Sequence, residues 1–515
     1  MPTYLTPGVY VEEIEAGARP IEGVGTAVAA FVGFAADGPF NTPTLVSNWG
    51  QFTQTFGDFV EGCYLAQSVY GYFLNGGTNC YIVRVGGSRA QDNGSTPKQL
   101  TARQAVLGGY RFVAKELPEG KQAGEITVEV ADPTGDNPAE DRFTVLVKQD
   151  GKVVETHNVT TKRTKENVVT AVREKSSYIT VEEAAGAVAK PEKGSATLTA
   201  PPKAPQEPPV PRRVAAGDYV GDVADRTGFG GLEAIDEITM VAVPDLMAAY
   251  QRELLDLDTV KAVQLAMIAH CELMGDRMAI IDPPPGLNPQ EVRGWRMDTA
   301  GYDSKYAALY YPWVQVLDPA TGTNAFIPPS GHMAGVWART DATRGVHKAP
   351  ANEVVRGALA LETHLTKAEQ ELLNPIGVNC VRSFSGKGIR VWGARTLSSD
   401  PAWRYLNVRR LFNYLEESIL NGTQWVVFEP NDDALWARIR RTISAFLVME
   451  WRKGALFGLT PDEAFFVKCD RETNPAEGID LGQVICEVGI APVKPAEFVI
   501  FRLAQMSGGT SLVNE

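Results

Sequence analysis

Residues 381–430 read VRSFSGKGIRVWGARTLSSDPAWRYLNVRRLFNYLEESILNGTQWVVFEP, and the rest of the chain is organised around this stretch. Ile389–Trp392 is a short apolar run between glycines, as expected of a strand. Trp403–Leu420 carries apolar residues at helical spacing, and Asn421-Gly422 ends that helix because both residues tolerate a left-handed backbone. Thr423–Phe428 is a second apolar run. We therefore predict a strand–helix–strand unit whose second strand is buried.

Several segments of the chain resemble the contractile tail sheath family, which covers phage tails, R-type bacteriocins and extracellular injection particles. Three are near the C-terminus: VWGARTLSSDPAWRYLNVRRL (391–411), GTQWVVFEPND (422–432) and GIAPVKPAEFVIF (489–501). A fourth, PGVYVEE (7–13), resembles the N-terminal arm of the family. The resemblance is long and specific, and it covers most of the chain outside about 90–217.

The composition limits the classes of function. A length of 515 residues predicts about three domains. With 44% hydrophobic and 22% charged residues, the chain is typical of soluble globular proteins. A net charge of −13 disfavours a nucleic-acid partner. Neither a membrane-spanning apolar run nor a secretory signal is present, so we expect no membrane insertion and no secretory export.

The cysteines and histidines predict no metal site. The six cysteines are scattered, none two to four positions from another, which is typical of buried thiols in a reducing cytosol. The five histidines are equally dispersed, at His157, His270, His332, His347 and His364. We therefore expect neither metal nor cofactor.

Met1–Pro20 is too short to be a domain, and we interpret it as an N-terminal arm. Its one alternating run places Val9 and Val11 on one face and Tyr10 and Ile14 on the other. A lone strand needs a sheet edge elsewhere. It either pairs within its own chain or adds to a neighbouring subunit, and the family resemblance favours the neighbour.

Residues 21–89 and 218–373 alternate strand and helix patterns, which predicts an α/β domain with a largely parallel sheet. The family resemblance implies that this middle domain is subtilisin-like in fold. The expected helices are 48–56, 63–74, 256–274, 288–299 and 351–361, and the expected strands are 26–36, 80–85, 238–243, 278–281 and 307–316.

Residues 90–217 interrupt that pattern with short strands at 126–130, 143–148, 152–159 and 178–181, and a helix at 165–175. The segment ends in Pro201–Pro211, which holds six prolines and predicts a stiff linker. We interpret it as an inserted β-rich domain. The resemblance places it on the outside, and two roles stay open, surface decoration or contact with another molecule.

Residues 374–494 form the predicted α+β C-terminal core domain, and 495–515 a C-terminal arm. A long helix is expected at Asp432–Gly454. The strand expected at Leu481–Ala491 is the candidate to receive neighbouring arms through Val484, Cys486, Val488 and Ile490. The C-terminal arm is expected to form a strand through Phe498, Val499, Ile500, Phe501 and Leu503.

Two segments of the sequence resemble enzymatic motifs. Asp245, Asp282, Ser330 and His332 suggest a protease, but Ser330 and His332 are too close in sequence to face each other on a helix. The simpler interpretation is that Ser330 caps a helix beginning near His332. The SFSGKG segment (383–388) lacks the spacing of a phosphate loop. We expect no catalytic residues.

The resemblance implies a structural sheath subunit, assembled in the bacterial cytoplasm into a virion tail or tail-like particle. Its expected partners are further copies in stacked hexameric rings, the inner tube, the baseplate and the terminator or cap proteins. We expect Arg438 and Arg441 to face the tube, and 16–25 and 492–495 to act as hinges. The alternatives are a non-contractile tail-tube or capsid protein, or a subtilisin-like hydrolase.

Overall fold

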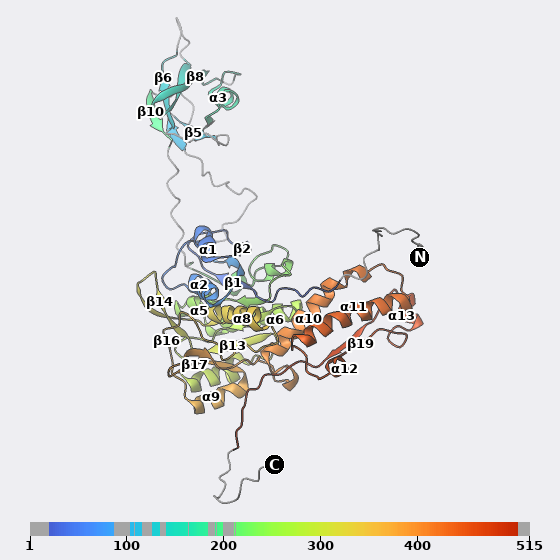
Figure 1. Cartoon of the computed structure of the whole chain (residues 1–515). Coiled ribbons are helices and arrows are strands. Elements are labelled where there is room, and N and C mark those ends of the chain that lie inside the picture. Colours follow the sequence, from blue (N-terminus) through green and yellow to red (C-terminus); the bar gives the residue numbers. More distant parts are fainter. Residues whose placement is uncertain are drawn as a thin grey trace, which may run out of the picture. The chain divides into compact units, whose positions relative to one another are not determined.

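The computed structural model describes residues 20–86, 104–107, 109–115, 126–133, 141–162, 164–183, 191, 193–198, 211 and 213–502. The chain divides into two compact units (Figure 1). The larger unit combines Met1–Ser88 with Pro208–Glu515, and the smaller unit is Arg89–Glu207.

An eight-stranded sheet lies at the centre of the larger unit. In sheet order its strands are β18 (Gly388–Val391), β17 (Val378–Phe384), β13 (Ala307–Tyr311), β12 (Met278–Ile281), β11 (Met240–Ala242), β1 (Val28–Gly33), β3 (Asn79–Arg84) and β2 (Thr44–Val46). The six inner strands are parallel, and only the edge strands β18 and β2 are antiparallel. The inner strands are buried on both faces, as parallel sheets require. The predicted largely parallel sheet is confirmed.

Helices cover this sheet, and half of those named below begin at a capping side chain. They are α1 (Trp49–Phe56), α2 (Leu65–Asn75), α4 (Ala216–Val220), α5 (Asp245–Gln251), α6 (Leu257–Met274), α7 (Pro289–Gly294), α8 (Ser330–Arg344) and α9 (Lys367–Leu373). Asn48, Asp256 and Asn288 each accept a hydrogen bond from a first-turn amide of the helix that follows. These caps explain why the predicted helix starts lie within two residues of the observed ones.

Glycines bring α2 and α8 close together. A Cβ atom at Gly331 would lie 2.4 Å from the Ser68 Cα, and one at Gly335 would lie 2.5 Å from the Tyr72 carbonyl oxygen. The two glycines of the segment PPSGHMAG (328–335) therefore allow the backbones of α2 and α8 to lie close together.

Two predictions for this part are wrong. Residues 351–361 form no helix; Asn352 and Gly357 have positive φ values of 58° and 83°, which a helix cannot contain. The strand expected over 307–316 is two strands, because Pro312 lacks the N–H that a continuous ladder needs. The second of them joins a small sheet of β15 (Thr323–Ile327), β14 (Val314–Asp318) and β16 (Ala360–Leu361).

The C-terminal part of the larger unit packs around α10 (Leu406–Gly422) and α11 (Asp433–Arg452) (Figure 1). It has its own buried core, made by Leu411, Leu415, Leu435, Ile439, Ile443, Phe446 and Leu447. The remaining elements are α12 (Pro461–Ala464), β19 (Phe465–Lys468), α13 (Ala476–Asp480) and β20 (Glu487–Ile490).

The buried strand predicted at Thr423–Phe428 is wrong. A short 3₁₀ turn, Gln424–Val426, follows α10, and the Phe428 side chain beyond it is fully exposed at 102%. The run between α10 and α11 is therefore divided: Trp425 and Val426 pack against the core of this part, whereas Val427 and Phe428 are exposed.

The smaller unit is β-rich with its own core. One antiparallel sheet has the order β10 (Gly194–Thr197), β6 (Ile126–Ala131), β7 (Arg142–Gln149) and β8 (Lys152–Thr160). The other has the order β4 (Gln104–Leu107), β5 (Tyr110–Ala114) and β9 (Ile179–Glu183), and α3 (Val168–Lys175) contacts β9 and β8. Alternate residues of β6 are buried, which places one face of its sheet on the core.

Candidate assembly interface

A two-stranded antiparallel sheet, β19 with β20, carries the predicted receiving strand. Val488 and Ile490 lie in β20, whereas Val484 and Cys486 precede it, so the strand is shorter than predicted. Within the described residues, no third strand pairs with β19 or β20 themselves; directly after β20, Pro492 forms an isolated antiparallel bridge with Leu456. Unpaired edges of this kind are templates for another strand.

Exposed apolar side chains surround this sheet. They are Phe457, Leu459, Phe466, Leu481, Ile485 and Val488. They lie on both faces of the sheet, since Phe466 pairs with Gly489 and Val488 with Val467, and exposed apolar side chains of this number are candidates for contact with another molecule.

The chain after β20 stays attached to its own body as far as Glu497. Val493 donates its amide to the Ala455 carbonyl at 3.2 Å, and Asn407 Nδ2 donates to the Val493 carbonyl at 3.0 Å. The residues 492–495, predicted to be a hinge, are therefore docked.

Glu497 is held by a clamp of three side chains, Arg395, Asn374 and Tyr405. Its carboxylate accepts from Arg395 Nε at 2.9 Å and Nη2 at 2.5 Å, from Asn374 Nδ2 at 2.8 Å and from Tyr405 Oη at 3.4 Å. Burial alone would raise the pKa of Glu497; hydrogen bonds from Arg395 and Asn374 outweigh it and lower the pKa below its ordinary value. No local pattern in the sequence indicates this clamp.

Beyond the clamp, the predicted arm residues point into solvent. Phe498, Val499, Ile500 and Phe501 are 74%, 69%, 78% and 84% exposed. Leu503, the last predicted arm residue, lies outside the described residues. Four consecutive exposed apolar side chains have no packing role within the described part of this chain.

At the other end, the predicted arm residues Val9, Tyr10, Val11 and Ile14 lie outside the described residues. From Pro20 onward the chain packs on α10: Ile21 is buried, and the Val24 amide donates to Ser418 Oγ at 3.1 Å. The described part of the second predicted hinge is therefore also docked.

A buried ion pair fixes the seam between α8 and α10. Arg410 binds Asp341 through both terminal nitrogens, at 2.9 and 2.5 Å, and donates to the Thr26 carbonyl at 3.0 Å. Thr26 Oγ1 donates to the same Asp341 carboxylate at 2.7 Å, so one carboxylate joins three segments. Pairs buried this deeply are costly to break.

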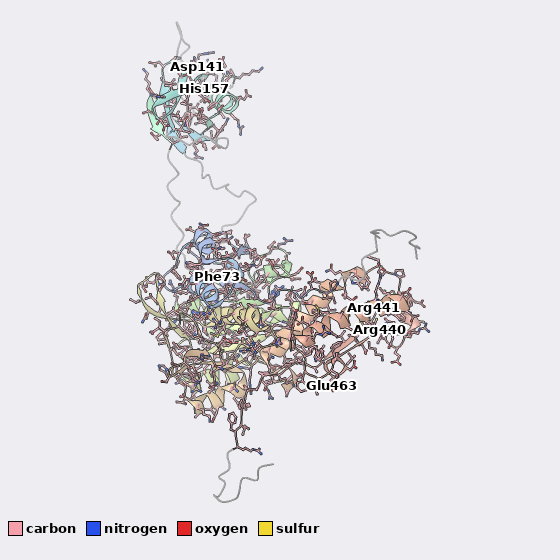
Figure 2. The ribbon with its side chains drawn as sticks, viewed as in Figure 1. Phe73, Asp141, His157, Arg440, Arg441 and Glu463 are labelled. Atoms are coloured by element: carbon pink, nitrogen blue, oxygen red, sulfur yellow. The ribbon has the colours of Figure 1, made fainter. Side chains whose placement is uncertain are left out.

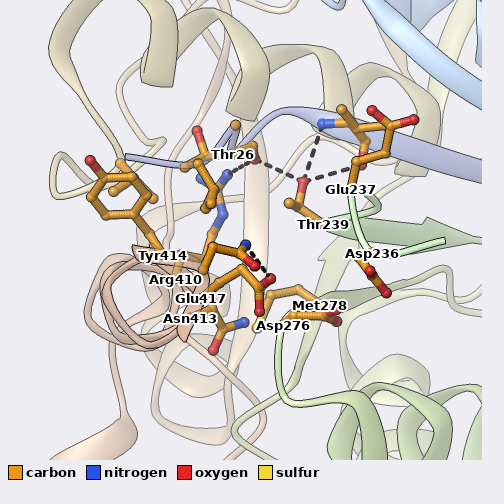
Figure 3. Close-up of a pocket in the computed structure, with 15 residues that line it drawn as sticks. Thr26, Asp236, Glu237, Thr239, Asp276, Met278, Arg410, Asn413, Tyr414 and Glu417 are labelled. Atoms are coloured by element: carbon orange, nitrogen blue, oxygen red, sulfur yellow. Dashed lines mark hydrogen bonds between the residues drawn. The ribbon is translucent and has the colours of Figure 1, made fainter. Parts of the chain in front are cut away.

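A cavity of about 250 Å³ lies beside this seam. Figure 3 shows Arg410, Tyr414 and Glu417 of α10 beside Thr26 and Thr239 in its lining. No group of acidic, His or Cys side chains in the described part of the chain is arranged to hold a metal ion.

The two arginines predicted to face the tube lie on α11 in different surroundings. Arg438 donates to Glu429 at 2.8 Å and stacks over the Trp425 ring at 4.6 Å. Arg441 is exposed, and no hydrogen bond or ion pair of its side chain is seen among the described residues. It lies next to Arg440 (Figure 2), whose guanidinium donates to the Cys469 carbonyl.

The protease-like residues are buried. Ser330 and His332 are 0% and 2% exposed, and neither Ser330 Oγ nor His332 Nδ1 finds a hydrogen-bond partner among the described residues. The predicted Ser330 cap is wrong: α8 begins at Ser330, whose amide donates to the Asp282 carboxylate at 2.9 Å. Asp245 accepts from the amides of residues 34, 64 and 65. Ser330 and His332 are therefore not aligned as a nucleophile–base pair in the described part of the chain.

No helix in the described part of the chain has the length and apolarity needed to cross a bilayer.

Comparison with known proteins adds independent information. A family model for the "Phage tail sheath protein central domain" matches residues 224–397, and one for the "Phage tail sheath C-terminal domain" matches 398–505. The tail sheath protein of Burkholderia phage BcepMu is 24% identical over 96% of this chain and 95% of its own length. That of Vibrio phage KVP40 is 26% identical over 44% of this chain, and the match spans only 35% of the phage protein. A prophage tail sheath protein of Pseudomonas aeruginosa is 28% identical, over 44% of this chain and 57% of its own length.

Solved structures agree with these matches. The anti-feeding prophage helical sheath in its contracted state is 26% identical, with a TM-score of 0.60 over 98% of this chain and 100% of that chain. A contracted sheath of an extracellular contractile injection system, PVC, has a TM-score of 0.58 at 24% identity and covers 98% of this chain and 99% of that one. With both sheath domains matched along 224–505 and the fold shared over nearly the whole length, the chain belongs to the contractile tail sheath family.

Proposed function

We propose that this chain is the repeating subunit of a contractile sheath, joined to its neighbours by exchanged strands. One observation carries the proposal: the chain leaves its own body at Glu497 with four exposed apolar residues, while the same body presents the open β19–β20 sheet. A segment whose apolar side chains are exposed on its own subunit can bury them by pairing with the open sheet edge of a neighbouring subunit.

In the proposed joint, Phe498–Leu503 adds to the β19–β20 sheet of one neighbour. The N-terminal strand Val9–Ile14 adds to that sheet as well, from another neighbour. Backbone hydrogen bonds give each joint its strength, and the exposed apolar residues around the sheet are covered when the strands arrive. The N-terminal arm of about 20 residues reaches roughly 65 Å when extended, enough to span to an adjacent copy.

The clamp at Glu497 and the docked segment at 20–25 refine the hinge proposal. Both segments are held to α10 or to the loops before it, so they move with their own body. We place the flexing before Pro20 on the N-terminal side, and at the junction between Glu497 and the strand beginning at Phe498 on the C-terminal side. The rings then turn and approach while the strand joints stay paired.

Contraction is proposed to draw its work from burial between subunits. If each subunit buries about 500 Å² more apolar surface in the contracted state, roughly 12 kcal/mol becomes available before polar costs. Summed over a sheath, that is enough to drive a tube through an envelope without a nucleotide.

The proposed partners are further copies in stacked hexameric rings, the inner tube, the baseplate and the terminator or cap. One related structure, 26% identical, is described as the anti-feeding prophage baseplate, and it has a TM-score of 0.57. We place assembly in the bacterial cytoplasm and the finished subunit in a tail or tail-like particle. The subtilisin-like fold of the middle domain is part of this proposal.

For the tube contact, Arg441 is the stronger candidate of the two arginines. Arg438 already has a carboxylate and an aromatic partner, whereas Arg441 is exposed and has its charge available. An acidic strip on the tube would complement it.

A truncation tests the proposal. A chain ending at Glu497 is expected to keep the circular dichroism of the full chain and to form no long sheaths in electron micrographs. A chain lacking only 507–515 serves as the control and is expected to polymerise. Deleting Met1–Glu13 is expected to abolish polymerisation too. Long sheaths from the chain ending at Glu497 would refute the strand-exchange proposal.

Electron microscopy of the full-length assembly distinguishes the remaining alternative. A contractile sheath gives hollow, ridged cylinders in a long narrow state and a short wide one. A tail-tube or capsid protein gives a single state.

A further inference from the structure

Two cysteines face each other at the end of the β19–β20 sheet. The strands pair antiparallel, with Phe465 opposite Ile490 and Lys468 opposite Glu487. One step further along the same register, Cys469 lies opposite Cys486. The other four cysteines lie elsewhere in the larger unit, on β3, α6, β17 and the loop before α2.

The register also fixes the type of pair. The Ala491 amide donates to the Ala464 carbonyl, so 464 and 491 form a hydrogen-bonded pair. Pair types alternate along an antiparallel ladder. Counting from 464–491, Cys469 and Cys486 occupy a non-hydrogen-bonded position, where Cα atoms approach to about 4.5 Å. That separation lies within the range that a disulfide spans.

The two thiols are close enough to affect one another: each is among the causes that shift the pKa of the other. Asn474 Nδ2 donates to Cys469 Sγ at 3.8 Å. Cys469 is fully buried, whereas Cys486 is half-buried and open to a small oxidant. Burial, together with the neighbouring Cys469 thiol, raises the pKa of Cys486 to about 12, so little thiolate is present at neutral pH.

We propose that Cys469 and Cys486 form a disulfide when the protein meets an oxidising disulfide such as glutathione disulfide. The Cys486 thiolate attacks one glutathione sulfur, forming a mixed disulfide and releasing one glutathione. Cys469 then attacks the Cys486 sulfur, forming the cystine and releasing the second glutathione. The two thiol protons end on the two glutathione molecules, which carry the two electrons.

The cross-link would tie the ends of β19 and β20 and close the loop 470–485 that contains α13. A covalent link across this sheet restricts its opening. On the proposed function, this sheet receives the neighbours' arms. The same disulfide would therefore stabilise the joints between subunits once the sheath leaves a reducing cytosol. The chemistry itself does not depend on that function.

Thiol titration and peptide mapping test the inference on the full chain. Reduced protein, freed of reductant, is incubated with glutathione disulfide at pH 7, 8 and 9, then denatured. The titratable thiols are expected to fall from six to four, and mass spectrometry to find one cystine joining Cys469 and Cys486. The rate is expected to rise about tenfold per pH unit, because the thiolate fraction does so well below the pKa.

A variant and a local probe complete the design. C486A is expected to keep its five thiols under the same treatment. In oxidised wild type, amide exchange across 470–485 is expected to slow by at least about tenfold. Six thiols after prolonged oxidation at pH 9, or a cystine joining any other pair, would overturn the inference. Polymerisation assays run in reductant test the proposed function separately, so the two failures are distinguishable.

Discussion

The clamp at Glu497 sets where the C-terminal arm leaves the body, and Glu497→Gln removes its charge with little change in shape. The glutamine keeps one acceptor oxygen but presents an NH₂ group to donors. Arg395, whose side chain is 10% exposed, then loses its bidentate partner and keeps a largely buried charge.

The cost follows from the burial of this pair. Exposed ion pairs contribute up to about 1 kcal/mol, and breaking a fully buried one costs about 3–5 kcal/mol. With side chains 10% and 19% exposed, the pair lies between these limits, and we expect a loss of about 2 kcal/mol. That corresponds to roughly a 30-fold increase in local opening.

Hydrogen exchange measures this opening at the Val493 amide, which donates to the Ala455 carbonyl just before the clamp. E497Q is expected to exchange there about 30-fold faster than wild type while α6 is unchanged. E477Q, at an exposed glutamate on α13, is the matched control and is expected to match wild type. Equal protection of Val493 in E497Q and wild type would refute the clamp.

The pH dependence gives a second readout. The folded pKa of Glu497 lies below its ordinary value of 4.5, so the clamp stabilises above that pH. Its contribution is lost as pH falls through the folded pKa. Wild type is therefore expected to open in acid below about pH 4.5, whereas E497Q lacks that step.

Three further changes have defined outcomes. Gly335→Ala places a Cβ 2.5 Å from the Tyr72 carbonyl oxygen and is expected to lower the free energy of unfolding by about 1–3 kcal/mol, measured by denaturant titration. Gly217→Ala, which meets no atom within 4 Å, is its control, and equal losses would contradict the close α2–α8 packing. Burial raises the pKa of Asp282 to about 7, so its stabilising contribution is full below pH 3.8 and lost as pH rises through 7. The free energy of unfolding of wild type minus that of D282N is therefore expected to decrease as the pH rises from 3.8 to 7, by at most about 1.4 kcal/mol per pH unit. A difference that does not change with pH would contradict the raised pKa of Asp282. Arg441→Glu is expected to weaken co-sedimentation with the inner tube most at low salt, and unchanged binding would remove Arg441 from the tube contact.

Local signals in the sequence located most of the elements in the larger unit. Asn48, Asp256 and Asp432 each precede an apolar helical pattern, and each accepts a first-turn amide in the structure. The order of strands and helices indicated a parallel sheet. Helix caps and the order of elements depend on residues that are close together in the sequence, so a single sequence is enough to predict them.

Features made by distant residues gave no such signal. Glu497 and Arg395 are about a hundred positions apart in the sequence. Neither residue belongs to a local pattern that predicts an ion pair. Cys469 and Cys486 became a pair only when the β19–β20 register was known. The apolar run ending at Phe428 fits a buried strand by composition, yet Val427 and Phe428 are exposed, because composition alone does not tell a buried apolar residue from an exposed one.

The most direct measurement is a cryo-EM map of the polymerised protein at a resolution that traces the chain. The account predicts that residues after Glu497 run into a neighbouring subunit and pair, backbone to backbone, with its β19–β20 sheet. A map in which Phe498–Phe501 pack against the subunit they belong to would contradict it.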